Sequence, residues 1–257
     1  MKSRNLQLSL IIPALNEQAN IANTIEDAIT ALKEFDILGE LVVVNDGSTD
    51  RTKEIVEEKI KKYPNKVSLV NHKKNKGVGA SFWSGADKAK GEVVVMHPGD
   101  NENDAREILK FFWLIKEVDL VIPFVFNKEV RSVSRRRLSM LYTYFINVVF
   151  FTKLNYTNGT TLYRKSLLKN LQYRATGFFY QADILIRLIK SGYLYAEVPH
   201  RLSTRAGGKS SAFKLRSILS FFKESIILFI DCYIKRDLKL KTGFPKDTIT
   251  FQKKKNE

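Results

Sequence analysis

Short apolar runs alternate with helix-patterned segments through the first 120 residues of the chain. The apolar runs lie at Leu6–Ile12, Leu41–Val44, Val67–Val70, Glu92–Met96 and Leu120–Ile122. Runs of this kind are typical of strands in a parallel sheet that helices cover on both faces. The sequence therefore predicts an α/β fold built on a mostly parallel sheet.

Segments with apolar residues at helical spacing separate these runs and follow the fourth of them. The expected helices span Asn20–Phe35, Arg51–Lys62, Gly77–Lys90 and Ala105–Lys116. Asp50 and Asp104 stand where a side chain can cap the second and the fourth helix. The alternation of strand and helix through this half is the pattern of repeated βα units.

The pattern changes in the second half of the chain. Long helices are expected at Arg131–Thr152 and Phe213–Ile234, both with an apolar face, and a shorter one at Gln181–Ser191. Short strands are expected within 155–163 and at 195–198, and the tail after Lys235 is expected to fray. A length of 257 residues suggests one domain with an appendage, which we divide as 1–211 (halves 1–120 and 121–211) and 212–257, an amphipathic helix with a basic tail.

The net charge of +16 is concentrated in the second half. Residues 1–120 hold 17 Lys and Arg against 19 Asp and Glu, whereas residues 121–257 hold 26 against 8. This asymmetry indicates two tasks on one chain. The basic half is expected to meet an anionic partner, such as phosphate groups, nucleic acid or an anionic membrane surface.

No segment has the uninterrupted apolar length of a membrane-spanning helix. Leu138–Phe151 is short and contains polar residues, and Ile218–Ile234 is interrupted by charges. Met1–Leu10 lacks the apolar core of a signal peptide, so the protein is expected to be soluble or peripheral and not exported.

Cys232 is the only cysteine, which excludes an internal disulfide and favours a reducing compartment.

Polar clusters follow three of the predicted strands, at Pro13–Glu17, Asn45–Asp50 and His97–Asp104. Ligands of parallel α/β sheets bind beyond the carboxyl ends of the strands. Glu17 could accept hydrogen bonds from a ribose or base and Asp46 from a nucleobase. Asp100, helped by Glu102 or Asn101, could bind a hard divalent cation. Read one at a time, each cluster is also compatible with an ordinary turn or helix cap.

Three further segments carry cations beside flexible or apolar sequence. Asn75-Lys76-Gly77-Val78-Gly79 opens a helix, where backbone amides could hold phosphate. Arg135, Arg136 and Arg137 precede an apolar, aromatic helix that could enter a lipid interface. The loop Arg205–Ser210 could close over a diphosphate. The alternatives are an ordinary basic helix start with core packing and an ordinary surface loop.

Taken together, these segments resemble family 2 glycosyltransferases of the GT-A fold, and among them the polyprenyl-phosphate (dolichyl-phosphate) hexosyltransferases. The matching segments occur in the family's order: LSLIIPALNEQANI, LVVVNDGSTDRT, NKGVGASFWSGADKAKGE, VVVMHPGDNE, NYTNGTTLYRKSLL and GFFYQADILIRLIKSGYLYAEVPHRLSTRAGGKSS. They cover residues 6–211. The family's Asp-x-Asp reads Pro98-Gly99-Asp100 in this chain, with one carboxylate instead of two.

The resemblance implies a GT-A (Rossmann-like) fold and a set of site residues. A nucleotide-sugar site is implied for Pro13, Ala14, Asn16, Glu17, Asp46, Ser48, Lys76 and Gly77. Mg²⁺ or Mn²⁺ is implied at Asp100, with Glu102 as a second ligand. Acceptor-phosphate contacts are implied for Arg135, Arg136, Arg137, Arg205 and Lys209. Asp183 would act as a base or orient the acceptor, so that Asp183 and Asp100 form the expected catalytic pair.

The implied activity is hexose transfer from a UDP- or GDP-sugar to a polyprenyl-phosphate-type lipid. The protein would act in cell-envelope biogenesis from the inner, cytoplasmic face of the membrane, as a peripheral protein on an anionic surface. Alternatives are transfer to a saccharide hydroxyl in cell-surface polysaccharide synthesis, with Asp183 as base, and a nucleotidyltransferase, which would release pyrophosphate. A nucleic-acid-binding protein would explain the basic half but not the three polar clusters, so nucleic acid is not an expected partner.

Overall fold

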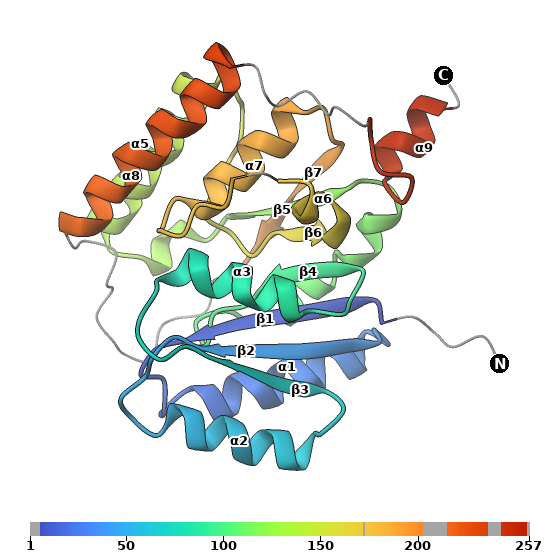
Figure 1. Cartoon of the computed structure of the whole chain (residues 1–257), viewed down its shortest axis with the longest axis vertical. Coiled ribbons are helices and arrows are strands. Elements are labelled where there is room, and N and C mark those ends of the chain that lie inside the picture. Colours follow the sequence, from blue (N-terminus) through green and yellow to red (C-terminus); the bar gives the residue numbers. More distant parts are fainter. Residues whose placement is uncertain (1–5, 172, 203–214, 236–242, 256–257) are drawn as a thin grey trace.

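A computed structural model describes residues 6–171, 173–202, 215–235 and 243–255 (Figure 1). The strands are β1 (Leu8–Ala14), β2 (Gly39–Asn45), β3 (Val67–Asn71), β4 (Val93–Met96), β5 (Leu120–Val125), β6 (Leu162–Arg164) and β7 (Tyr195–His200). The helices are α1 (Ile21–Glu34), α2 (Thr52–Lys62), α3 (Val78–Lys88), α4 (Arg106–Leu109), α5 (Val133–Phe150), α6 (Lys165–Lys169), α7 (Tyr180–Lys190), α8 (Leu215–Phe229) and α9 (Ile249–Lys255). Two 3₁₀ segments, η1 (Phe112–Lys116) and η2 (Lys128–Val130), and a π-helical segment, η3 (Ile230–Ile234), complete the elements.

The strands form one seven-stranded sheet in the order β3-β2-β1-β4-β6-β5-β7. Strands β1 to β4 pair in parallel, and β5 pairs in parallel with β7. The short β6 is antiparallel to both β4 and β5, so β5 and β7 run in the same direction as the first four strands. Six of the seven strands therefore end at one edge, and the expected mostly parallel sheet is confirmed.

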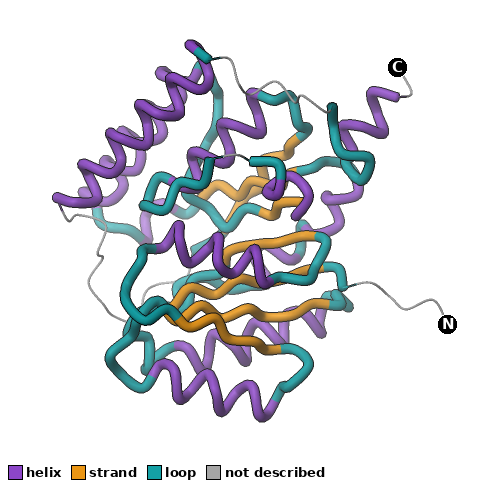
Figure 2. Tube along the Cα trace, viewed as in Figure 1, coloured by secondary structure: helices purple, strands orange, loops and turns teal. Residues whose placement is uncertain are grey.

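Helices cover both faces of the sheet and bury two separate apolar clusters (Figure 2). Alternate residues along a strand point to opposite faces. In β1, Leu10 and Ile12 accordingly pack with α1, α2 and α4, while Ile11 packs with α3 and α7 on the opposite face. Because both faces are covered, the apolar runs lack polar alternation, as the sequence indicated.

Three sequence predictions are wrong in this region of the fold. The expected helix Ala105–Lys116 is divided into the short α4 and the 3₁₀ segment η1. The tail does not fray throughout, since residues 249–255 form α9 against the domain. Asp50 accepts a hydrogen bond from the Thr52 amide and Asp104 from the Arg106 amide, but the N-cap residues of α2 and α4 are Arg51 and Ala105 and not the two aspartates that the sequence predicted.

Helices α5 and α8 lie side by side on the outside of the second half (Figure 1). Phe221 of α8 contacts Tyr142 and Phe145 of α5. The expected helix over 213–234 is observed as α8 followed by the π-helical segment. Within the described ranges, no helix combines the length and hydropathy needed to cross a membrane.

Candidate functional site

The candidate site lies at the edge where six strands end. The loops after β1 and β2 are joined there by backbone-to-side-chain hydrogen bonds. The Asn16 amide donates to Ser48 Oγ at 3.0 Å, the Thr49 amide donates to Asn16 Oδ1 at 2.9 Å, and the Glu17 amide donates to Thr52 Oγ1 at 2.8 Å. Asn16 adopts a positive φ of 57°, an uncommon conformation that asparagine tolerates better than most residues. The structure therefore brings two of the three predicted polar clusters into one surface.

Asp46, at the end of β2, is the best-connected carboxylate of this edge. Its Oδ1 accepts from the Lys76 amide at 2.9 Å and lies 2.7 Å from His72 Nδ1, while its Oδ2 accepts from the Gly77 amide at 2.9 Å. His72 Nε2 lies 3.0 Å from Ser84 Oγ, so both ring nitrogens of this buried histidine have partners. The loop between β3 and α3 is thus held on Asp46.

These contacts correct one expectation. The amides of Lys76 and Gly77 were expected to hold phosphate, but both donate to Asp46 instead. Gly77 adopts a positive φ of 98°, which glycine tolerates, at the turn into α3. The exposed Lys76 side chain remains available to an anion at this edge.

The loop after β4 packs directly on the end of β1. The Gly99 amide donates to the Pro13 carbonyl at 3.2 Å, and a Cβ on Gly99 would lie 2.9 Å from that oxygen. This close approach explains the glycine before Asp100. Asp100 is half-buried, and its Oδ1 accepts from the Glu102 amide at 3.2 Å. Among the described residues, no group of three or more His, Cys, Asp or Glu side chains is arranged to hold a metal.

Two buried histidines close the sheet edge beyond this loop. Burial lowers the pKa of His97, at the end of β4, to about 4. Burial also lowers the pKa of His200, at the end of β7, and its Nε2 lies 3.3 Å from Asn103 Oδ1. Both rings are therefore neutral at neutral pH. His200 links β7 to the β4 loop through Asn103, a contact that sequence spacing did not indicate.

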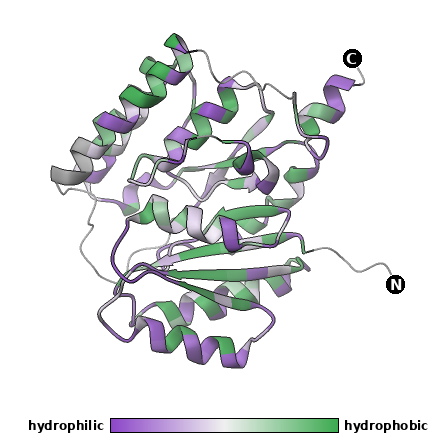
Figure 3. Ribbon diagram, viewed as in Figure 1, coloured by the Kyte–Doolittle hydropathy of each residue, from purple (hydrophilic) through white to green (hydrophobic). Residues whose placement is uncertain are grey.

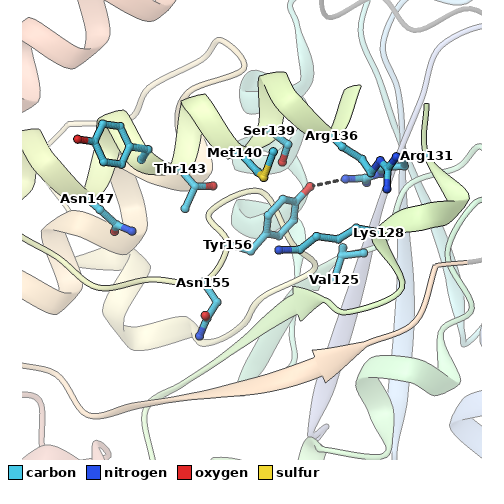
Figure 4. A pocket seen from close by; sticks show the side chains of 11 residues that line it. Val125, Lys128, Arg131, Arg136, Ser139, Met140, Thr143, Asn147, Asn155 and Tyr156 are labelled. Atoms are coloured by element: carbon cyan, nitrogen blue, oxygen red, sulfur yellow. Dashed lines mark hydrogen bonds between the residues drawn. The ribbon is translucent and has the colours of Figure 1, made fainter. Parts of the chain in front are cut away.

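A basic pocket opens at the end of β5, beside helix α5 (Figure 4). It has a volume of about 240 Å³, and its lining includes Lys128, Arg131 and Arg136 but no carboxylate. Arg131 Nη1 donates to Tyr156 OH at 3.0 Å, which fixes the guanidinium on the pocket wall. The remaining lining residues are Val125, Ser139, Met140, Thr143, Tyr144, Asn147 and Asn155. Such a lining suits an anionic group.

Of the three consecutive arginines, the pocket includes Arg136 alone. Arg135 and Arg137 do not line it, because neighbouring residues of a helix point about 100° apart. Sequence reasoning did not assign Lys128 or Tyr156 to a site, since they lie on separate loops that meet α5 only in the folded chain. Arg205 and Lys209, the other predicted phosphate contacts, fall outside the described residues.

Asp183 is not at the surface of the site. It is fully buried in α7, where its Oδ1 accepts from Arg187 Nε at 2.9 Å. Arg187 Nη2 in turn lies 2.8 Å from Asp231 Oδ2, in the π-helical segment after α8. Burial raises the pKa of Asp183 to about 7, against the opposing charge of Arg187. In this arrangement Asp183 joins α7 to the end of α8 through Arg187, and its role toward an acceptor stays a prediction.

Apolar side chains of the outer helix pair are exposed, and the hydropathy colouring of Figure 3 shows hydrophobic residues along α8. On α5 these include Met140 (54% exposed), Leu141 (65%) and Tyr144 (68%), and on α8 they include Phe222 (53%) and Ile226 (58%). Met140 and Tyr144 also line the basic pocket. The rim of that pocket is therefore continuous with an apolar surface, which a soluble monomer seldom exposes without a partner.

The fold defines an α/β protein whose loops after β1 and β2 are joined at one edge of the sheet. Comparison with known proteins gives the family. Residues 9–172 match the model of glycosyl transferase family 2. The chain belongs to this family.

Curated relatives include a dodecaprenyl-phosphate galacturonate synthase from Rhizobium johnstonii, 27% identical over 172 residues, which are 66% of this chain and 51% of that protein. A dolichyl-phosphate beta-glucosyltransferase, ALG5A, from Trichomonas vaginalis is 36% identical over 119 residues, which are 44% of this chain and 36% of that protein. The chain thus spans about half the length of these relatives, or less.

Solved structures confirm the expected GT-A fold. Glucosyl-3-phosphoglycerate synthase from Mycobacterium tuberculosis, in complex with Mn²⁺, UDP and glucosyl-3-phosphoglycerate, superposes with a TM-score of 0.59 at 22% identity. The match covers 92% of this chain and 82% of that one. The same enzyme with Mg²⁺ and UDP gives a TM-score of 0.61 at 21% identity, covering 92% of this chain and 81% of that one.

Proposed function

We propose that this protein transfers a hexose from a UDP- or GDP-sugar to a polyprenyl-phosphate-type lipid at the cytoplasmic face of a membrane. One observation carries the proposal: the basic pocket and an exposed apolar helix surface share Met140 and Tyr144. A lipid phosphate has both an anionic head and an apolar chain, so it matches this pair of surfaces. The names of the curated relatives, which act on dodecaprenyl and dolichyl phosphates, support the same acceptor class.

The donor belongs to the joined loops at the ends of β1 and β2. Asn16, Glu17 and Ser48 form a continuous polar surface there, together with Pro13 and Ala14. Asp46 Oδ2 has one internal donor, the Gly77 amide, and retains acceptor capacity for a nucleobase N–H. The exposed Lys76 ammonium supplies positive charge for the diphosphate. Residues 1–120 would accordingly hold the donor and residues 121–211 most of the acceptor.

Asp100 and Glu102 would hold Mg²⁺ or Mn²⁺. Both provide oxygen donors, and magnesium is commonly bound by one or two carboxylates together with substrate phosphates, so the two side chains fit this requirement. When bound, the metal would neutralise charge on the departing nucleoside diphosphate. The titles of the M. tuberculosis structures, with Mn²⁺ or Mg²⁺ beside UDP, agree with this choice.

The pocket's cations position the acceptor. Lys128, Arg131 and Arg136 would orient the lipid phosphate so that one of its oxygens attacks the anomeric carbon of the hexose. The bond from that carbon to the nucleoside diphosphate breaks, and its electron pair leaves with the diphosphate oxygen. A phosphate oxygen is already anionic near neutral pH, so no general base is needed. This agrees with the burial of Asp183, whose Oδ1 is occupied by Arg187.

The exposed surface of α5 and α8 would rest on the lipid. Apolar side chains there would enter the interface, while Arg135 and Arg137 would meet anionic headgroups, each contributing about 1 kcal/mol. Replacing Arg135, Arg136 and Arg137 together with Gln should reduce flotation with anionic liposomes and leave nucleotide binding unchanged. A wild-type protein that ignores anionic liposomes at low salt would contradict the membrane part of the proposal.

The acceptor is tested by matched arginine variants. Release of UDP or GDP is measured with a panel of nucleotide sugars, with and without polyprenyl phosphate in detergent. Arg136→Gln and Arg131→Gln should lower lipid-dependent release about 10-fold or more, since each removes a charged contact to phosphate. Arg137→Gln, on the same helix but outside the pocket, should not. Full activity of the Arg136 and Arg131 variants, or hexose transfer only to a soluble saccharide, would overturn the assignment.

A further inference from the structure

Residues 174–177 form a strap that runs between α3 and α8. On the α3 side, Arg174 Nη1 pairs with Asp87 Oδ2 at 2.7 Å, and the Ala175 carbonyl accepts from Trp83 Nε1 at 3.0 Å. The Thr176 carbonyl accepts from the Ala80 amide at 3.2 Å. Three successive residues of the strap are therefore fixed to α3, from its last turn to its first turn.

The strap packs directly against the first turn of α3. A Cβ on Gly79 would lie 2.7 Å from the Thr176 carbonyl carbon and oxygen, so only glycine permits this approach. Gly77, two residues earlier, is the residue whose amide donates to Asp46 Oδ2. The strap consequently supports the loop that meets the proposed donor site.

On its other side the strap is held by Glu224, in the middle of α8. Glu224 Oε1 accepts from the Gly177 amide at 3.1 Å, and a Cβ on Gly177 would lie 2.7 Å from Ser220 Oγ. Only 5% of Glu224 is exposed, and burial raises the pKa of its carboxyl. A carboxylate is costly to bury unless it is hydrogen-bonded, so the position of Glu224 depends on the strap amides.

Helix α8 therefore has two faces with different tasks. Glu224 and Leu228 point inward, whereas Phe222, Ile226 and Phe229 are exposed by 53%, 58% and 41%. If the exposed face enters lipid, as proposed above, the lipid fixes the outer face of α8. Glu224, on the inner face, then holds the strap. A helix seated in this way stabilises the strap, the start of α3 and the two amides on Asp46 together.

We propose that Glu224 is a positioning residue through which the seating of α8 on a lipid surface raises the affinity of the donor site for nucleotide. The inference rests on the proposed membrane function. The coupling runs from Glu224 to Gly177, across the strap to Gly79, and from Gly77 to Asp46. Because a coupling free energy is reciprocal, bound nucleotide must strengthen lipid binding by the same factor.

The first experiment measures both sides of this linkage with the full chain. The dissociation constants of UDP and GDP, with Mg²⁺, are determined alone, with phosphatidylcholine vesicles, and with vesicles that also contain phosphatidylglycerol. Anionic vesicles should tighten binding of whichever nucleotide binds by about fivefold or more, the usual lower range of allosteric coupling. Vesicle binding, measured by flotation, should tighten by an equal factor when that nucleotide is present.

The variants assign the effect to Glu224. Glu224→Ala should abolish the vesicle-dependent gain in nucleotide affinity while vesicle binding without nucleotide is retained. Glu224→Gln keeps an oxygen for the Gly177 amide and should preserve most of the gain. Ser225→Ala is the matched control, because Ser225 Oγ donates to the Phe221 carbonyl within α8 and not to the strap. A purely structural role would instead lower the melting temperature and leave the gain unchanged.

A second variant tests the contact between the strap and α8 in case Glu224→Ala does not fold. Gly177→Ala would place a methyl group against Ser220 and Glu224, move the strap away from α8, and should also remove the gain. Vesicle binding by the wild type without any change in nucleotide affinity would overturn the coupling but leave the proposed lipid docking intact. A gain that persists in both Glu224→Ala and Gly177→Ala would overturn the role of Glu224. A wild type that binds no vesicles would overturn the membrane proposal and the coupling with it.

Discussion

The carboxylate of Asp119 holds Thr250 across 131 positions of the chain. Asp119 Oδ2 accepts from the Thr250 amide at 3.0 Å and from the Thr250 hydroxyl, and Oδ1 accepts from the Ile249 amide at 2.7 Å. Arg164 Nε lies 3.2 Å from the same Oδ1. The residue before β5 thereby caps α9 and attaches the C-terminal helix to the sheet.

Asp119→Ala should release α9 and lower the free energy of unfolding by about 3–5 kcal/mol, because it leaves Arg164 and two backbone amides without their buried acceptor. Chemical denaturation would give the loss, and amide hydrogen exchange should show it first at residues 249–255. Asp247→Ala, an exposed change in the same segment, is the control. Unchanged exchange at α9 in Asp119→Ala would show that other contacts hold the helix.

Asp46→Ala should weaken nucleotide binding by about 1–3 kcal/mol through a lost charged hydrogen bond. His72→Ala should weaken it by a smaller amount, since Asp46 keeps the amides of Lys76 and Gly77 but loses the imidazole. Calorimetry with UDP and GDP measures both effects, and Asp27→Ala on exposed α1 surface provides the control. Equal affinity of wild type and Asp46→Ala for the nucleotide that binds would remove Asp46 from the donor site.

Asp100→Asn should reduce turnover by about 100-fold or more, in line with the loss of a main electrostatic group. The half-buried Asp100 side chain makes a local hydrogen bond only to the Glu102 amide, which an Asn oxygen can also accept, so folding should be preserved. EDTA should abolish wild-type turnover, and added Mg²⁺ or Mn²⁺ should restore it. Full activity in EDTA would refute a role for the metal.

Burial of His97 should make the folded protein less stable as the pH falls. Burial lowers its pKa from an ordinary 6.5 to about 4, so the unfolded chain takes up this proton at higher pH than the folded chain does. Stability is therefore retained above pH 6.5 and falls as the pH drops toward 4, by up to about 3 kcal/mol.

Replacing His97 with Asn should remove this part of the pH dependence. Unfolding free energies of both proteins between pH 4 and 8 isolate it, since His200 and the carboxylates titrate in both. Parallel profiles for the two proteins would show that His97 does not titrate as its burial requires.

Much of the first half of the fold was predictable from local pattern. The five apolar runs are β1 to β5, because a run of apolar residues between turn signals is a property of consecutive residues. The polar clusters after β1, β2 and β4 meet at one edge because parallel strands all end there. The prediction of one helix over 105–116 was wrong. Ala105, Ile108 and Leu109 are buried, but the turn after them is a 3₁₀ segment.

The site was predictable only in part. Asp46 follows β2 directly and Asp100 lies in the loop after β4, so sequence position was enough to bring them to the sheet edge. The basic pocket combines Lys128, Arg136 and Tyr156 from two loops and a helix, and no local pattern relates them. Asp183 was assigned from a motif position, and only the folded chain shows that it is buried in α7 and paired with Arg187.

The sequence by itself determined most strands and helices of the first half, and that the polar loops share one sheet edge, since both follow from periodicity and from parallel pairing. Only the tertiary structure decided which charges are available for function. Asp46 is held by the loop after β3, Asp183 is paired with Arg187, and Glu224 reaches the strap from a helix 47 positions away. These outcomes depend on burial and on partners distant in sequence, and hydrogen bonds of that kind have no signature in neighbouring residues.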